Sequence, residues 1–119
     1  MFTTILQVAL GGAIGASARY LIGLSVAFPF GTLIVNVVGS FVMGLAFLAL
    51  ADKGLLRWQP LILTGVLGGF TTFSAFSLDV YRLFESGRMA ASGAYVATSV
   101  ILSVGALFLG IAFYRVVQG

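Results

Sequence analysis

The sequence predicts an all-α integral membrane protein with four transmembrane helices, the third of them broken near its middle. Its 119 residues are 61% hydrophobic and only 8% charged, with a mean hydropathy of +1.17, whereas about a quarter of the residues in a soluble domain are charged. The apolar stretches are continuous, which favours helices over the alternating strands of a β-barrel. The uncharged stretch 58–78 contains an unusual cluster of glycine and hydroxyl residues, which predicts the break.

Four apolar stretches are long enough to cross a bilayer, which takes roughly 20 helical residues. The charged residues that separate them are Arg19, Asp52, Lys53, Arg57, Asp79, Arg82, Glu85, Arg88 and Arg115. The predicted spans are 3–24, 32–51, 59–84 and 90–114, joined by short connections. We therefore expect a single domain, residues 1–119, that crosses the membrane four times.

Composition excludes several other classes of protein. The chain has no cysteine, so it can form neither a disulfide framework nor a thiolate metal site. Its net charge of +3 comes from six scattered cations without a basic run, which does not indicate nucleic-acid binding. The first apolar stretch has no basic leader and is longer than a signal-peptide core, so we interpret it as the first membrane helix.

Glycine spacing indicates where helices pack closely. The first span contains Gly11 and Gly15, and Gly12 with Ala16, each pair four residues apart; the third contains Gly65 and Gly69. Small residues at this spacing let helix backbones approach one another in membranes. We expect these pairs to serve packing.

Two polar stripes follow the second and fourth spans at helical spacing. They are Thr32, Asn36 and Ser40 on one, and Tyr95, Ser99 and Ser103 on the other. Polar groups that face lipid are costly, so such stripes either bond neighbouring helices or line a wet track. The residues alone leave both uses open.

The predicted break lies in residues 68–76, GGFTTFSAF. Glycines followed by threonines are poor helix formers, and unwound backbone at membrane depth must be buried in protein or line a wet cavity. Its free carbonyls could coordinate a cation and its free amides an anion. Phe73 and Phe76 follow on one helical face, beside Ser74 and Ser77. The positive ring edges could contact a small anion, or the pair could simply pack in the core.

The charges predict an unusual orientation in the membrane. Lys53, Arg57 and Arg115 share the side of Met1, while Arg82 and Arg88, with Arg19 near the end of the first span, lie opposite. Such balance hardly biases insertion under the positive-inside rule. Dual topology and an antiparallel dimer are therefore possible, unless other cues fix one orientation. Four short helices fill their own interior, so oligomerisation is expected.

The string GGFTTFSAFS at residues 68–77, with Gly31-Thr32-Leu33-x-x-Asn36 and Arg19 before it, closely resembles the Fluc/CrcB family of fluoride channels. The resemblance covers the whole chain in length, helix layout and motif order. It implies a dual-topology homodimer in the inner (plasma) membrane of the cell. Two antiparallel pores would export cytoplasmic fluoride passively and confer fluoride resistance, and a structural sodium ion would lie at the dimer centre.

The resemblance also implies roles for particular residues. Backbone carbonyls of Gly68 and Thr71 would hold the sodium ion, and Arg19 would draw anions into a vestibule. The remaining residues would line the fluoride pore: Asn36, Thr72, Phe73, Ser74, Phe76, Tyr95, Ser99 and Ser103. Two positions depart from the family pattern, because Ala75 replaces a usual threonine and Asp79 stands where some relatives have glutamate.

Other functions find less support in the sequence. A proton-coupled small multidrug transporter also has four short helices, but it needs a carboxylate within the membrane, and Asp79 is the sole candidate. A purely structural subunit of a larger complex is a second alternative. An enzyme is not expected, because histidine and cysteine are absent and the three carboxylates cannot pair within a bilayer.

Overall fold

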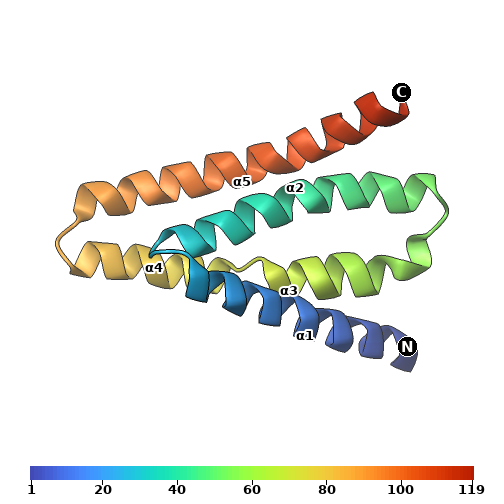
Figure 1. The fold of residues 1–119 in the computed structure, drawn as a ribbon, viewed down its shortest axis with the longest axis horizontal. Coiled ribbons are helices and arrows are strands. Elements are labelled where there is room, and N and C mark those ends of the chain that lie inside the picture. Colours follow the sequence, from blue (N-terminus) through green and yellow to red (C-terminus); the bar gives the residue numbers. More distant parts are fainter.

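All four predicted spans are helical in the computed structural model, which describes residues 1–119 and contains no strand (Figure 1). Helix α1 covers Phe2–Ser25, α2 covers Phe30–Asp52 and α5 covers Met89–Gln118. The third span, Leu56–Glu85, is made of several shorter pieces. Each span is long and apolar enough to cross a membrane. The predicted boundaries are thus confirmed, with each span extended by one or more residues at both ends.

Tight turns connect the spans. Gly54, between α2 and the third span, has a φ of +67°, and Gly87, before α5, has a φ of +83°. Only glycine adopts this left-handed region at little cost, because it has no Cβ. The chain therefore reverses direction within a few residues, and both termini lie at one end of the molecule (Figure 1).

The third span begins with a 3₁₀ turn, η1 (Leu56–Trp58), and a π-helix, η2 (Pro60–Leu67). It continues as α3 (Gly68–Phe70) and α4 (Phe73–Glu85). Between these two helices the backbone is extended at Thr71 (φ −86°, ψ 157°) and Thr72 (φ −155°, ψ 123°). The predicted break is confirmed.

The glycine pair at the predicted break is itself helical, which corrects one part of the prediction. Gly68 and Gly69 belong to α3, and the chain unwinds two residues later. A Cβ at Gly69 would stand 2.8 Å from the carbonyl oxygen of Gly12 on α1. Gly69 therefore permits close packing, and the two threonines form the break.

Helix α1 packs along η2 and α3 through its glycines (Figure 1). A Cβ at Gly11 would lie 2.8 Å from the Cα of Gly65, and one at Gly15 would overlap the carbonyl oxygen of Val66. These are contacts between backbones. They confirm the packing role predicted for Gly11, Gly15, Gly65 and Gly69, whereas a Cβ at Gly12 would meet nothing within 4 Å.

A second close contact joins α2 to α5, which run side by side (Figure 1). A Cβ at Gly44 would overlap the carbonyl oxygen of Leu107, and one at Gly110 would overlap that of Phe41. Near the termini, the Tyr114 hydroxyl donates to Asp52 at 2.6 Å and ties the ends of the two helices together. The bundle thus has two tightly packed helix pairs, α1 with η2 and α2 with α5.

Candidate functional site

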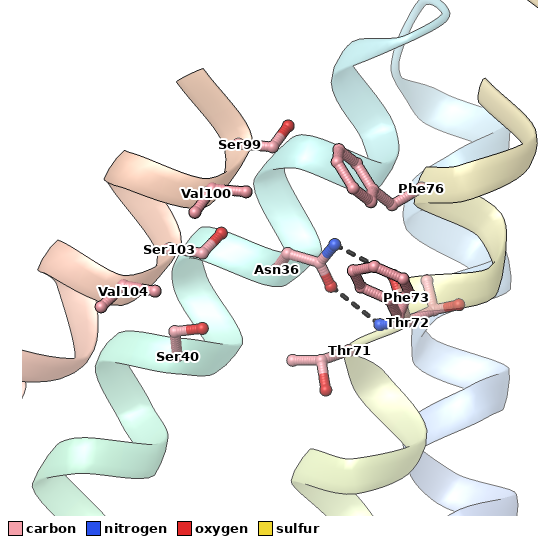
Figure 2. Close-up of a pocket in the computed structure, with 10 residues that line it drawn as sticks. All are labelled: Asn36, Ser40, Thr71, Thr72, Phe73, Phe76, Ser99, Val100, Ser103 and Val104. Atoms are coloured by element: carbon pink, nitrogen blue, oxygen red, sulfur yellow. Dashed lines mark hydrogen bonds between the residues drawn. The ribbon is translucent and has the colours of Figure 1, made fainter. Parts of the chain in front are cut away.

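Asn36 on α2 holds the extended residues of the break. Its Nδ2 donates to the Thr72 carbonyl oxygen at 3.0 Å, and its Oδ1 accepts from the Thr72 N–H at 2.8 Å (Figure 2). One side chain thus satisfies both backbone groups of Thr72, which have no helical partner. Without these bonds, two polar groups would be unsatisfied in a low-dielectric surrounding.

The hydroxyl groups of the motif start α4. The Thr72 hydroxyl accepts from the Ala75 N–H at 3.1 Å as a side-chain N-cap, and it lies 3.2 Å from the Ser74 hydroxyl. Threonine is a preferred N-cap because its oxygen satisfies an otherwise unpaired N–H at a helix start. The Thr71 hydroxyl bonds back to the Leu67 carbonyl at 3.0 Å, at the end of the preceding helix.

The break leaves the backbone carbonyls from Gly68 to Thr71 without their usual helical donors, and of these Gly69 accepts from Arg19 instead. The donor for Gly68 would be the Thr72 N–H, which bonds Asn36 instead. The donor for Thr71 would be the Ala75 N–H, which bonds Thr72. Neutral carbonyl oxygens suit a hard cation, and no cluster of histidine, cysteine or carboxylate is present to hold a softer or more highly charged one. The oxygens of Gly68 and Thr71 are of the kind that coordinates hard cations.

Arg19 on α1 also contacts the break. Its Nε donates to the Gly69 carbonyl oxygen at 3.0 Å. The side chain is half-buried and does not line the groove described next. Arg19 therefore places a positive charge at the end of α3, where unpaired carbonyls carry partial negative charge.

A groove of about 350 Å³ lies between α2, α5 and the break (Figure 2). The two polar stripes predicted on the second and fourth spans meet here. None of the lining residues is charged. They are Asn36, Ser40, Thr71, Thr72, Phe73, Phe76, Ser99, Val100, Ser103 and Val104.

Phe73 and Phe76 stand together at the start of α4, with ring centroids 5.4 Å apart and ring planes tilted by 54° (Figure 2). The Phe76 ring is buried and packs at 5.4 Å against Tyr95. The Phe73 ring, by contrast, is 76% exposed in the single chain. The pair therefore consists of one ring that its own chain buries, Phe76, and one ring that its own chain leaves largely exposed, Phe73.

Two serine hydroxyls on α5 have no hydrogen-bond partner. The Oγ atoms of Ser99 and Ser103 are buried, and neither makes a hydrogen bond of normal length within the protein, although Ser99 lies close enough to the Tyr95 hydroxyl to interact with it weakly. A membrane serine can bond the carbonyl four residues before it, as Ser25 and Ser77 do here. Figure 2 shows Ser99 and Ser103 facing the side of the groove where Asn36 and Phe76 lie. The hydrogen-bonding capacity of these hydroxyls is thus not met by normal hydrogen bonds within the chain.

Most of the residues expected in the pore lie together, and two do not. Asn36, Thr72, Phe73, Phe76, Ser99 and Ser103 line the groove. Tyr95 lies directly behind Phe76, and its hydroxyl donates to the buried Asp79 carboxylate at 3.1 Å. Ser74 is exposed outside the groove, and Arg19 lies on Gly69.

Sequence reasoning did not assign Ser40, Val100 and Val104 to the site. Ser40 shares the helical stripe of Asn36, so helical spacing could have placed it there. Val100 and Val104 are four residues apart and share the helix face next to that of Ser99 and Ser103. Apolar residues in an apolar span carry no signal of their own, so only the fold identifies them.

Comparison with known proteins decides the family. The profile of the family described as "CrcB-like protein, Camphor Resistance (CrcB)" matches residues 6–111. The chain belongs to the CrcB family. It is 54% identical over 121 residues to the fluoride-specific ion channel FluC of Cereibacter sphaeroides (strain ATCC 17029 / ATH 2.4.9), covering 97% of each chain.

Other members of the family are similar over nearly their whole length. The chain is 52% identical to the fluoride-specific ion channel FluC of Ruegeria sp. (strain TM1040), covering 92% of this chain and 93% of the relative. It is 49% identical to the protein of the same name from Paracoccus denitrificans (strain Pd 1222), with 94% of each covered. These names describe ion channels, and none describes an enzyme.

Proposed function

We propose that this protein is a fluoride-selective ion channel whose pathway follows the groove beside the break. The observation that carries the proposal is the pair of buried, unpartnered hydroxyls of Ser99 and Ser103, which face a groove next to Phe73 and Phe76. Unpaired donors in a buried position are costly unless something binds them. The names of the FluC relatives support fluoride as the ion.

The groove has the chemistry that a small, strongly hydrated anion requires. Hydroxyls from α5 and the second N–H of the Asn36 amide are donors that replace water around fluoride. The edges of the Phe73 and Phe76 rings carry partial positive charge and face an anion favourably. Because no lining residue is charged, no fixed cation traps the ion, as conduction requires.

The proposed assembly is an antiparallel homodimer with two pores in the inner membrane, through which fluoride leaves the cell passively. Two observations support it. Phe73 is 76% exposed beside a groove that its own chain does not close. The cations are also divided almost evenly between the two ends of the bundle, which permits insertion in both orientations.

The Gly68 and Thr71 carbonyls are proposed to hold a structural sodium ion. Both lack their helical donors, and both are neutral oxygens. Two oxygens from one chain are too few to surround a cation, whereas two copies supply four. When bound, the ion would neutralise the partial charges of these carbonyls and join the two breaks.

Fluoride-electrode measurements on proteoliposomes test the proposal. Liposomes that contain the wild-type protein should release fluoride and retain chloride. Phe73→Ile and Phe76→Ile should each suppress fluoride efflux, because the aliphatic side chain has no positive edge. Phe108→Ile, on an exposed ring of α5 outside the groove, should leave efflux unchanged. Equal fluoride and chloride flux, or wild-type efflux in both pore variants, would refute the proposal.

One observation favours the alternative of a proton-coupled drug transporter. Asp79 is a buried carboxylate within a membrane span, and such groups often relay protons. Its carboxylate bonds Tyr95 and does not line the groove, which favours a supporting role. Export of a cationic dye driven by a pH gradient, abolished by Asp79→Asn, would favour the transporter.

A further inference from the structure

A second cavity, of about 230 Å³, lies where the turn between α1 and α2 meets α4. It is separate from the groove and mostly polar in character. Its lining residues are Gly23, Val26, Phe28, Pro29, Gly31, Thr32, Asp79 and Arg82. Thr32 belongs to the polar stripe of α2 that continues into the groove at Asn36 and Ser40.

The two charged residues of this cavity differ in how accessible they are to an ion from outside the protein. The Asp79 carboxylate is buried and accepts a hydrogen bond from Tyr95. The Arg82 residue is exposed. Its guanidinium makes no side-chain hydrogen bond, and no carboxylate oxygen lies within 4.0 Å of it. Arg82 is therefore the charge that an incoming ion would meet first.

Polar side chains connect this cavity with the groove. Asp79 lines the cavity and bonds Tyr95, which precedes Ser99 by one helical turn of α5 and packs on Phe76. Ser99 and Ser103 then line the groove. The sequence of groups thus runs from an exposed guanidinium near the end of a membrane span to the two unpartnered hydroxyls.

We propose that this cavity is the mouth through which small inorganic anions enter and leave the groove at this end, and that Arg82 concentrates them there. This inference rests on the proposed fluoride conduction. It assigns the electrostatic attraction to Arg82, since Arg19 is engaged with the Gly69 carbonyl outside the groove. An exposed, unpaired cation at a polar opening raises the local anion concentration, whereas the Asp79 carboxylate of the same cavity is buried and accepts a hydrogen bond from Tyr95.

The test is fluoride efflux from proteoliposomes at low fluoride, with the ionic strength set by an impermeant salt. Arg82→Gln should lower the efflux rate about fourfold at low ionic strength. This fold-change is the Boltzmann factor for the attraction between two opposite unit charges about 5 Å apart at the dielectric constant of water. Arg82→Lys should retain most of the rate. The loss should disappear near 1 M salt, where the Debye length is about 3 Å.

Arg88→Gln is the matched control, because Arg88 is exposed, follows α4 and lies outside the cavity. Its efflux should equal that of the wild type. Unchanged efflux in Arg82→Gln, or equal losses in both variants, would overturn the inference. So would a loss that is the same at all ionic strengths, which indicates a structural role, because salt screens electrostatic attraction at an exposed site. A wild-type protein that conducts no fluoride would instead refute the proposed function.

Discussion

Asn36 is the residue on which the geometry of the break depends most directly. An extended pair of residues inside a membrane span exposes N–H and C=O groups that a helix would have satisfied internally. The Asn36 amide has one donor and one acceptor at the right separation, and it bonds both groups of Thr72. A second N–H of the same amide remains for a ligand in the groove.

Replacing Asn36 should therefore affect both stability and conduction. Asn36→Ala leaves two backbone groups unpaired, and we expect the free energy of unfolding to fall by about 1–3 kcal/mol. Asn36→Asp keeps the acceptor for the Thr72 N–H but loses both N–H donors of the amide. This variant should therefore conduct less fluoride than the wild type. Thermal unfolding in detergent and liposome efflux measure the two effects. A fully stable, conducting Asn36→Ala protein would show that the break does not need this side chain.

Much of the site could be predicted from individual residues, but not how each one is used. Helical spacing placed Asn36 and Ser40 on one stripe and Ser99 and Ser103 on another, and the groove joins them. Spacing gives no information about hydrogen-bond partners. It could not show that Asn36 holds Thr72, nor that Arg19 contacts Gly69, because both contacts depend on how the helices pack.

At the scale of helices, the sequence predicted the spans and the existence of the break. It did not predict the π-helix of η2, because residue propensities and hydrophobic spacing over residues 60–67 do not distinguish a π-helix from an α-helix. The packing of α1 on the third span followed from paired glycines. The packing of α2 on α5 was not predicted, although Ser40 with Gly44 and Ala106 with Gly110 have the small-residue spacing that predicted close packing in the first span.

The α2–α5 contact gives a prediction at this scale. A Cβ at Gly110 would overlap the carbonyl oxygen of Phe41, and a backbone atom cannot move aside as a flexible side chain can. A Cβ at Gly105 would meet nothing within 4 Å. Gly110→Ala should therefore destabilise the protein by about 1–3 kcal/mol, and Gly105→Ala on the same helix should not. Thermal unfolding of the two variants in one detergent compares them directly. Equal melting temperatures would mean that α2 and α5 can move apart at Gly110 without loss of stability.

At the scale of the whole molecule, the single chain leaves much of its functional surface open. Phe73 is largely exposed, and the groove beside it is bounded by α2, α5, the break and the start of α4. Basic residues lie at both ends of the bundle. Both features agree with a second copy inserted in the opposite orientation, which the sequence of one chain can suggest only through its charge balance.

Topology can be measured because the chain has no cysteine of its own. Ala90 and Gln118 are exposed near opposite ends of α5. In intact spheroplasts, a membrane-impermeant thiol reagent should label about half of Ala90→Cys and about half of Gln118→Cys, since the charge balance barely biases insertion. Full labelling of one variant with none of the other would establish a single orientation and exclude the antiparallel dimer.

The backbone contacts at Gly11, Gly15, Gly44 and Gly110 have a consequence for how variation in this protein should be interpreted. In a saturation mutagenesis screen for growth in fluoride, these positions should reject every substitution as strictly as the residues proposed to line the pore. Intolerance to change would then mark helix spacing and permeation alike. Only a measurement that separates assembly from transport would tell the two groups of residues apart.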